Sequence, residues 1–280
     1  MKKISRRSFL AAAGLSVAAL ALTACGGSSA STASSVASSA AASSEAASTS
    51  AAAGELTTVE AGKLTMATNA TFPPYEMTTD AGDIEGIDVE TAQAIADKLG
   101  LELQIDDMDF DAALLSVQQG KADIVMAGVT VTDERKAVMA FSDSYATGIQ
   151  SIIVPEGSDI ASPDDLAGKK IGTQRGTTGY IYCSDDFGDE NVVAYDDGLT
   201  AVQALNNGQV DAVVIDNAPA KEFIAANPGL VILETSYAEE DYAIGLAKGS
   251  SLEDAINSAL EELKADGTLQ SIVDKYISAE

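Results

Sequence analysis

The sequence predicts an α/β fold built from two similar units, and three observations support this prediction. Short apolar runs that suit buried strands alternate with helix-length amphipathic segments from residue 55 onward. The segment 110–128 follows the order helix, glycine, aspartate and apolar strand, and the segment 198–216 repeats that order. Alternating strands and helices favour largely parallel sheets that helices cover on both faces.

The elements of the first unit carry recognisable end signals. Asp88 suits the N-cap of a helix that stops at Gly100, and Gly120 stops the next helix. The expected elements, in order, are strand 63–68, helix 89–99, strand 101–105, helix 110–119 and strand 123–127.

The second unit continues the alternation. Its expected strands are 169–173, 192–195, 212–215, 231–233 and 242–246, and its expected helices are 177–183, 199–206 and 218–226. Two amphipathic helices follow, with apolar residues at Leu252, Ile256, Leu260 and Leu263 in the first and at Leu269, Ile272, Val273 and Tyr276 in the second.

The internal repeat matches Gly120 with Gly208 and Asp123 with Asp211. Ligands of open α/β sheets bind beyond the carboxyl ends of the strands, which lie at 127–128 and 215–216. If two lobes face each other, both ends line one cleft. Helix–glycine–strand units occur throughout α/β proteins, so the repeat alone does not establish two lobes.

The segment 1–24 predicts export. A basic start that includes Arg6 and Arg7 precedes an apolar run ending in Leu-Thr-Ala before Cys25. This ending resembles the bacterial lipobox, which implies that the signal is cut before Cys25 and that Cys25 is lipidated. The alternative is an ordinary secretory signal with a chance cysteine. The segment 5–10 also resembles a twin-arginine export signal.

The segment after Cys25 has no capacity to form a core. Apart from Val36 and Glu45, residues 26–54 are all Ser, Ala, Gly or Thr. We therefore expect 25–54 to form a flexible tether and 55–280 to form the folded part.

Composition excludes several functions. Forty-three Asp and Glu against 16 Lys and Arg give a net charge of −27, which argues against nucleic-acid and anionic-lipid partners. The chain has no His, which excludes histidine-based catalysis and most zinc sites. We expect no catalytic residue, no metal and no cofactor. Cys183 is the one other cysteine and is expected to pack inside a helix.

Arg135 is the candidate cation. Thr132 suits an N-cap and the two acids after it suit the first helical turn, whereas Arg135 opposes the helix dipole there. A buried guanidinium can hold a carboxylate through two parallel hydrogen bonds. A solvated charge is the alternative.

Other candidate residues follow strands or open helices. Asp216 ends an apolar strand, where its carboxylate could take an ammonium group or cap the next helix, and local sequence favours neither. Phe72 lies in a polar loop and could face a ligand, whereas core packing is the stronger interpretation for Phe110. The segment 176–179 (Gly-Thr-Thr-Gly) opens a helix whose free N–H groups favour an anion. It lacks the ending of an ATP-binding loop.

Five motifs together resemble the polar amino-acid-binding proteins of ABC importers, which are bacterial extracellular solute-binding proteins of family 3. Each motif is weak alone, but they occur in order and the resemblance covers residues 60–278. The motifs are ATNATFPPYE at 67–76, GIDV at 86–89, MDFD at 108–111, GVTVTDERK at 128–136 and FSDSY at 141–145.

The resemblance implies a type II periplasmic-binding-protein-like fold, with two lobes, two hinge crossings and a cleft between the lobes. Lobe 1 would comprise 55–147 and 242–280, and lobe 2 would comprise 148–241. The crossings would lie near 145–150 and 238–242. Such lobes close on one free amino acid, and the closed form docks on a membrane permease.

The resemblance also implies roles for the charged ends of a ligand. Arg135 would hold the α-carboxylate, helped by Thr130 and by the backbone N–H groups of Thr130 and Thr178. Asp216 and the Gly128 carbonyl would hold the α-ammonium group. A zwitterion needs such a fixed pair of charges, because unpaired buried charges are costly.

The side chain of the ligand would lie between Phe72 and Phe110, and Asn69 and Gln174 would help to select it. Asn69 replaces an acid that would suit a basic side chain and so favours an uncharged, glutamine-like ligand, although Ile215 replaces a polar residue of glutamine binders and Glu76 could meet a cation. The implied ligand-binding residues are Asn69, Phe72, Phe110, Gly128, Thr130, Arg135, Gln174, Thr177, Thr178 and Asp216.

The expected function is a monomeric, lipid-anchored extracellular receptor that delivers a polar L-amino acid to an ABC permease and is not an enzyme. Its tether suits a Gram-positive-type cell surface. One alternative is a dehydratase on the same scaffold, which would need Glu76 or Asp216 as a general acid. Another is a surface adhesion or sensing lipoprotein.

Overall fold

The computed structural model describes residues 56–277. The predicted export signal, the lipidation site Cys25 and the tether all lie outside the described residues. The described residues belong to a single compact unit. No helix within 56–277 is both long enough and apolar enough to cross a membrane.

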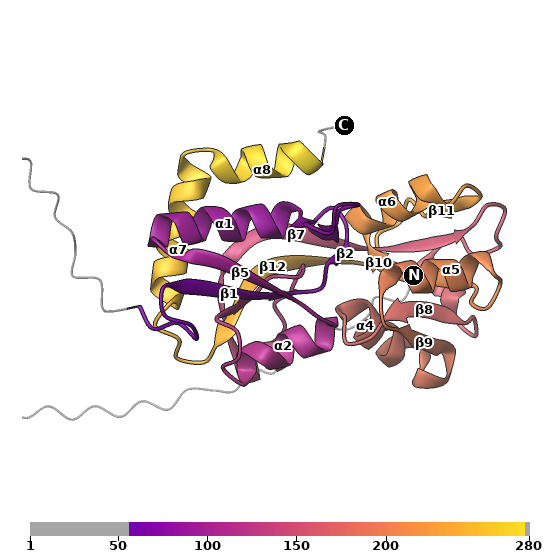
Figure 1. Cartoon of the computed structure of the whole chain (residues 1–280). Helices are drawn as coiled ribbons and strands as arrows, with labels where there is room; N and C mark the ends of the chain where they lie inside the picture. Colours follow the sequence, from indigo (N-terminus) through magenta and orange to yellow (C-terminus); the bar gives the residue numbers. More distant parts are fainter. Residues whose placement is uncertain (1–55, 278–280) are drawn as a thin grey trace, which may run out of the picture. The chain divides into compact units, whose positions relative to one another are not determined.

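One mixed sheet organises this unit (Figure 1). Its strands are β1 Lys63–Thr68, β5 Glu102–Asp107, β6 Ile124–Val125, β7 Met139–Pro155, β8 Ile171–Gln174, β9 Val192–Tyr195, β10 Ala212–Asp216, β11 Leu230–Ile232 and β12 Ala238–Ala247. The order is β5-β1-β6-β12-β7-β10-β8-β9, with β11 beside β7. We call β5-β1-β6 the first half and β10-β8-β9 the second half. Each half is parallel.

Helices cover both halves. They are α1 Ile87–Leu99, α2 Phe110–Gln118, α3 Asp133–Val138, α4 Thr178–Phe187, α5 Gly198–Asn206, α6 Asn217–Ala226, α7 Glu253–Ala265 and α8 Thr268–Tyr276. Two 3₁₀ turns occur at Pro163–Leu166 and Asp189–Asn191. In Figure 1, α1 and α8 lie above the strands of the first half and α2 lies below them. A small sheet, made of β2 Thr71–Phe72, β3 Glu76–Thr78 and β4 Ile84–Glu85, precedes α1.

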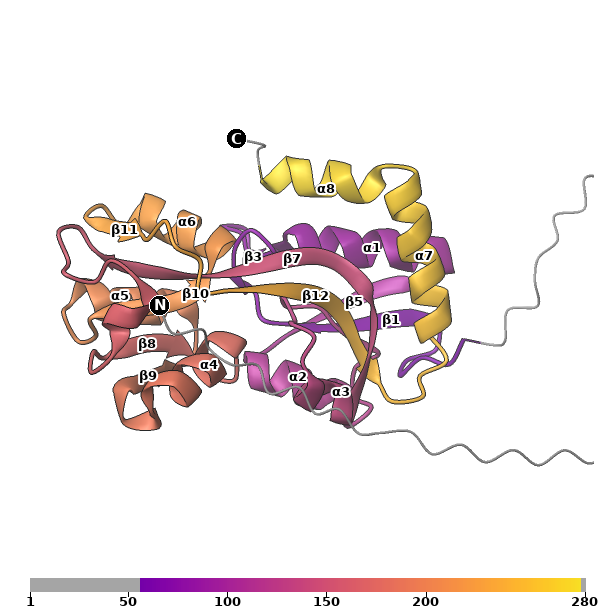
Figure 2. The ribbon, with the colours of Figure 1, turned by 180° about the vertical axis from the view of Figure 1, so that it is seen from behind.

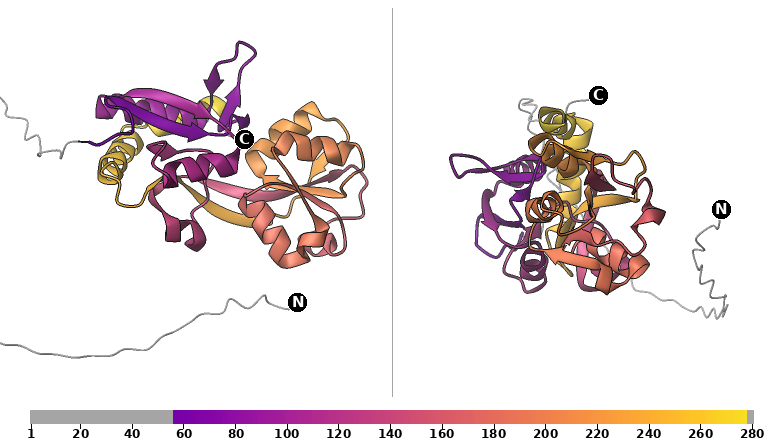
Figure 3. Two further views of the ribbon diagram at one scale, coloured as in Figure 1. Left: turned by 60° about the horizontal axis from the view of Figure 1, so that its bottom comes forward. Right: turned by 90° about the vertical axis from the view of Figure 1, so that its right-hand side faces the viewer.

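Two long antiparallel strands, β7 and β12, join the halves (Figure 2). Their pairing runs from Ala238 opposite Gln150 to Ala247 opposite Met139, with register shifts between Tyr242 and Gly245. The segments expected as hinge crossings, 145–150 and 238–242, therefore pair with each other. In the left view of Figure 3, these strands run from one group of helices to the other.

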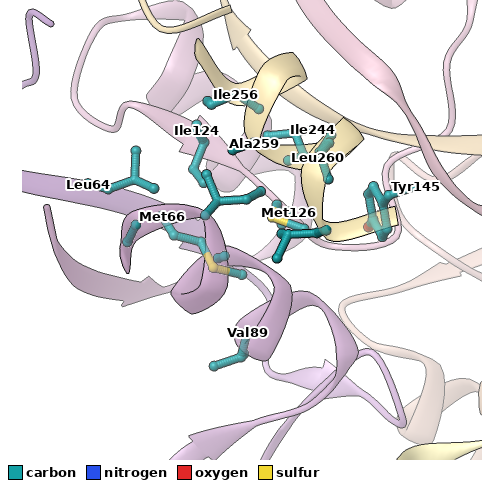
Figure 4. Packing of buried hydrophobic residues seen from close by; sticks show 14 of the residues in the cluster. Leu64, Met66, Val89, Ile124, Met126, Tyr145, Ile244, Ile256, Ala259 and Leu260 are labelled. Carbon is teal, nitrogen blue, oxygen red and sulfur yellow. The ribbon is translucent and has the colours of Figure 1, made fainter. Parts of the chain in front are cut away.

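The buried apolar residues divide in the same way. One pair of clusters packs β1, β6 and β12 against α1, α2 and α7, and a second pair packs β7, β8 and β10 against α4, α5 and α6. Figure 4 shows Leu64, Met66 and Ile124 of the first half close to Ile256 and Leu260 of α7. Burial of each such side chain contributes about 1.5–3 kcal/mol relative to exposure.

The internal repeat has a structural counterpart. The N–H group of Thr65 donates to Asp123 Oδ2 at 2.8 Å, and the Asp123 N–H group donates back to the Thr65 carbonyl at 2.9 Å. Lys170 and Asp211 make the same two bonds, at 2.7 and 2.8 Å. Each aspartate thus fixes the start of its strand to a neighbouring parallel strand.

Several predictions about elements are wrong in detail. Asp88 does not cap a helix, because α1 already begins at Ile87 and Asp88 is fully buried in its first turn. The strand predicted at 123–127 is only two residues long, β6 at Ile124–Val125. The strand predicted at 101–105 lies at Glu102–Asp107, as β5. The sheet is antiparallel at its centre, because the long strand β7, of which only a crossing near 145–150 was expected, connects the halves there.

Candidate functional site

One pocket contains all ten residues that the family resemblance implied. The pocket is concave and lined by both apolar and polar side chains, as ligand sites commonly are. The carboxyl ends of β6 and β10 both reach it, through Gly128 and Asp216, as the repeat predicted. Six further residues line it: Glu76, Ala127, Gln150, Val214, Ile215 and Tyr242.

Arg135 is buried in this pocket rather than solvated. Thr132 caps α3 by accepting the Arg135 N–H group at 3.2 Å, as predicted. Arg135 is 8% exposed, and its guanidinium donates to the carbonyl oxygens of Thr130 at 2.8 Å and Gly176 at 3.1 Å. It lies 5.4 Å from the centre of the Phe110 ring. Burial lowers the pKa of Arg135, and a carboxylate beside it would favour its charged form.

Arg135 also retains hydrogen-bonding capacity. A guanidinium has five N–H donors, and two of them are used by the two carbonyl oxygens. No carboxylate of the described residues approaches within salt-bridge distance of Arg135. The remaining N–H groups can therefore donate hydrogen bonds to a planar anionic group.

Asp216 is the buried acid of the second half. It caps α6 by accepting the Ala218 N–H group at 3.0 Å, so the capping interpretation is correct. Its other oxygen accepts the Ile149 N–H group at 2.7 Å, and the Tyr242 hydroxyl hydrogen-bonds to the same carboxyl group. Burial raises the pKa of Asp216 to about 6 despite these donors. A carboxylate that both caps a helix and lines a pocket can still attract an ammonium group.

The start of α4 presents backbone donors to the pocket. Thr177 caps the helix by accepting the Tyr180 N–H group at 3.3 Å, and Thr178 is the first helical residue. The first N–H groups of a helix have no partner within it and carry a partial positive charge. This arrangement favours an anion near Thr178, next to Arg135.

The two amide side chains expected to select the ligand bond to each other. Gln174 Nε2 donates to Asn69 Oδ1 at 2.8 Å across the pocket. Asn69 Nδ2 also donates to the Met108 carbonyl at 3.0 Å. A polar ligand side chain would insert between these amides or exchange bonds with them.

Aromatic rings form the pocket wall. Phe72 stacks on Tyr75, with ring centres 5.7 Å apart. Gly128 has a φ of +54°, and a Cβ there would lie 2.8 Å from Phe72 Cε1. Only glycine allows Phe72 to approach the end of β6 so closely.

A buried acid pair lies beneath Gly128 and was not predicted as a unit. Asp88 Oδ2 accepts the Gly128 N–H group at 3.0 Å, and Glu76 and the Tyr145 hydroxyl interact with the same carboxyl group. Both acids are 0% exposed. Burial raises the pKa of Glu76 well above its usual value and that of Asp88 to about 6.

Sequence analysis also missed Glu240, which is 6% exposed on β12. Its neighbours Glu239 and Asp241 are exposed, as strand alternation requires. That alternation was the available signal, but the segment 238–242 was considered only as a hinge crossing. Cys183, by contrast, is buried on α4 as predicted, and burial raises the pKa of its thiol to about 12, so it is unreactive.

Comparisons with known proteins agree with the motifs. The family model described as bacterial extracellular solute-binding proteins, family 3, matches residues 64–279. The L-cystine-binding protein TcyJ of Escherichia coli K12 is 33% identical over 226 residues, covering 79% of this chain and 85% of that protein.

Two solved structures are similar in sequence and fold. A mutant of ArgBP from T. maritima is 41% identical, with a TM-score of 0.74 over 78% of this chain and 96% of that chain. An ancestral arginine-binding protein bound to glutamine is also 41% identical, with a TM-score of 0.74 over 78% and 99%. The fold is that of the type II periplasmic binding proteins. The chain belongs to the bacterial extracellular solute-binding proteins of family 3.

Proposed function

We propose that this protein is an extracellular receptor that binds one free polar L-amino acid and delivers it to an ABC permease. The observation that carries this proposal is the pocket itself. A buried arginine with unused donors and a buried aspartate line the same pocket, between aromatic walls. These are the groups that a zwitterion requires.

In this proposal, Arg135 binds the α-carboxylate together with the backbone N–H groups of Thr130 and Thr178. Asp216 and the Gly128 carbonyl bind the α-ammonium group. The aromatic walls exclude water and so strengthen both interactions.

The two halves act as lobes that close on the ligand. We assign 55–147 and 242–280 to lobe 1 and 148–241 to lobe 2, with β7 and β12 as the hinge. The division of the buried apolar residues into separate clusters supports these boundaries. We further propose that the mature receptor is a monomer anchored through a lipid on Cys25.

Glutamine-like ligands remain the first candidate, since Asn69 and Gln174 offer amides rather than charges to the side chain. A second candidate is a cationic amino acid. Two acids, Glu76 and Asp216, line the pocket, whereas Arg135 is the one cation among the described residues that line it. A cationic ligand would reduce this negative excess. The names of the similar structures, arginine-binding proteins, are compatible with either candidate because one of them is bound to glutamine.

A thermal-unfolding panel tests the proposal. Residues 55–280 would be freed of co-purified ligand by unfolding and refolding, then heated with each of the twenty L-amino acids at about 1 mM. A ligand with a Kd near 1 μM stabilises the fold by about 4 kcal/mol. A shift with glutamine supports the first candidate, and shifts with arginine and lysine support the second. A panel without any shift would contradict the receptor function.

A further inference from the structure

A second groove lies between the two halves, next to the candidate ligand pocket. Its volume is about 370 Å³, and residues of both halves and of the connecting strand β7 line it. Among these residues are Tyr75 and Tyr276 of the first half, Ala218 and Glu222 of α6, and Thr147 and Ile149 of β7. We call it the rear groove.

The rear groove and the ligand pocket lie on opposite faces of the strands that join the halves. Successive side chains of a strand point to opposite faces. On β7, Thr147 and Ile149 line the rear groove, whereas Gln150 lines the pocket. Figures 1 and 2 show the same division. The helices that border the groove, α6 and α8, lie above β7 and β12, and the helices whose first residues line the pocket, α2 and α4, lie below them.

On the pocket side, direct hydrogen bonds join the halves. Gln174 Nε2 donates to Asn69 Oδ1 at 2.8 Å, and the Arg135 guanidinium donates to the Gly176 carbonyl oxygen at 3.1 Å. Each of these bonds connects a residue of the first half with a residue of the second half. The structure therefore shows the halves in contact at the pocket, while the rear groove keeps an open volume between them.

Strands that connect two bodies can act as a hinge. When the halves approach each other on one face of β7 and β12, they must separate on the other face. The rear groove therefore widens when the halves close on the pocket, and it narrows when they open.

We propose that the rear groove controls closure, so that a side chain that fills the groove favours the closed arrangement and raises the affinity for the ligand. This inference rests on the proposed function for closure on an amino acid. Apparent affinity is reduced in proportion to the fraction of the protein that is in the binding-competent arrangement. A shift toward that arrangement therefore tightens binding without any new contact to the ligand.

Ala218→Leu tests the inference. Ala218 lines the rear groove and packs against the apolar cluster of the first half, so the added atoms of leucine occupy space that narrows when the halves open at the pocket. Ala225→Leu is the matched control, because Ala225 is exposed on the same helix and does not line the groove. If Ala218→Leu does not fold, Thr147→Phe fills the groove from an exposed position on β7.

Small-angle X-ray scattering without amino acid and calorimetric titration with the amino acid found in the thermal panel are the measurements. Before ligand is added, we expect Ala218→Leu to be more compact than the wild type, and at saturation we expect the two to be equally compact. Ligand affinity should rise by at least about threefold in Ala218→Leu. Ala225→Leu should match the wild type in both measurements.

Two results would overturn the inference. One is a folded Ala218→Leu variant that binds the ligand no more tightly than Ala225→Leu. The other is equal scattering of Ala218→Leu and the wild type before ligand is added. A wild-type protein that binds no amino acid would contradict the proposed function, whereas the scattering comparison would still decide the role of the groove.

Discussion

Replacement of Arg135 by alanine should abolish tight ligand binding while leaving the fold in place. Two of the five guanidinium donors bind carbonyl oxygens, so a carboxylate can take two more. Each hydrogen bond that involves a charged group contributes about 1.5–3 kcal/mol, and truncation of one partner of a buried charged pair costs about 2–5 kcal/mol. We therefore expect Arg135→Ala to weaken binding by about 3–5 kcal/mol, or two to three and a half orders of magnitude.

Isothermal titration calorimetry measures this loss, and Arg175→Ala provides the control. Arg175 directly precedes Gly176, whose carbonyl oxygen accepts a hydrogen bond from Arg135, but the Arg175 side chain is 56% exposed and its ion pair with Asp196 is long, at 3.6 Å. Exposed pairs contribute little, so Arg175→Ala should change the affinity less than about threefold. Since burial disfavours the Arg135 charge, the unliganded Arg135→Ala variant should remain folded. An Arg135→Ala variant that binds within threefold of the wild type would refute the assigned role of Arg135.

Three further predictions concern the buried acids and the start of α1. The raised pKa values of Glu76 and Asp88 mean that the folded state binds protons more tightly than the unfolded state, so stability should rise as the pH falls from 7 to 5. The melting temperature should therefore increase between pH 7 and pH 5 in the wild type. Glu76→Gln should reduce this increase and should stabilise the protein at pH 7. Gly86→Ala should lower stability by more than about 3 kcal/mol, since a Cβ there would lie 2.1 Å from the Tyr75 carbonyl oxygen and φ is +139°. Asp216→Asn should weaken ligand binding about ten- to hundredfold in calorimetry, because it removes the charge that faces the ammonium group.

Each of these predictions has a matched control. Glu85→Gln changes an exposed acid near Glu76 and should leave the pH dependence unaltered. Gly82→Ala also has a positive φ, but no atom lies within 4 Å of the added Cβ, so thermal unfolding should show a smaller loss than at Gly86. Asp197→Asn removes the charge of a helix cap outside the pocket and should leave the affinity unchanged, because asparagine caps helices as well as aspartate does. Equal effects in variant and control would contradict the corresponding prediction.

The sequence predicted the local elements better than their assembly. Helices ended by Gly100 or capped by Thr132 and Thr177 were predictable, because the interactions that fix those ends lie within a few residues. The 17-residue strand β7 was not, because its course depends on pairing with β12, nearly a hundred residues later in the chain. The sheet therefore differs from the expected parallel arrangement at its centre.

The site shows the same distinction. The ten residues in one pocket could be named because family motifs carry their positions, although their ligand roles remain proposals. The acid pair of Glu76 and Asp88 depends on β3 and α1 packing together beneath Gly128, which no local pattern encodes. The local sequence instead suggested that Asp88 caps a helix, because it stands just before the expected helical residues. Glu240 was not identified because it stands between two other acids in the sequence. Its burial, and the exposure of Glu239 and Asp241, follow from the pairing of β12 with β7.

Recognition of a free zwitterion is the central claim, and one titration series tests it most directly. The wild-type protein would be titrated with the amino acid that shifts its unfolding most, then with the corresponding amino-acid amide and the N-acetyl amino acid. We expect one free amino acid bound per chain, with at least about a hundredfold weaker binding when either the α-carboxylate or the α-ammonium group is blocked. Equal binding of the amide and the free acid would contradict the role of Arg135, and equal binding of the N-acetyl derivative would contradict that of Asp216.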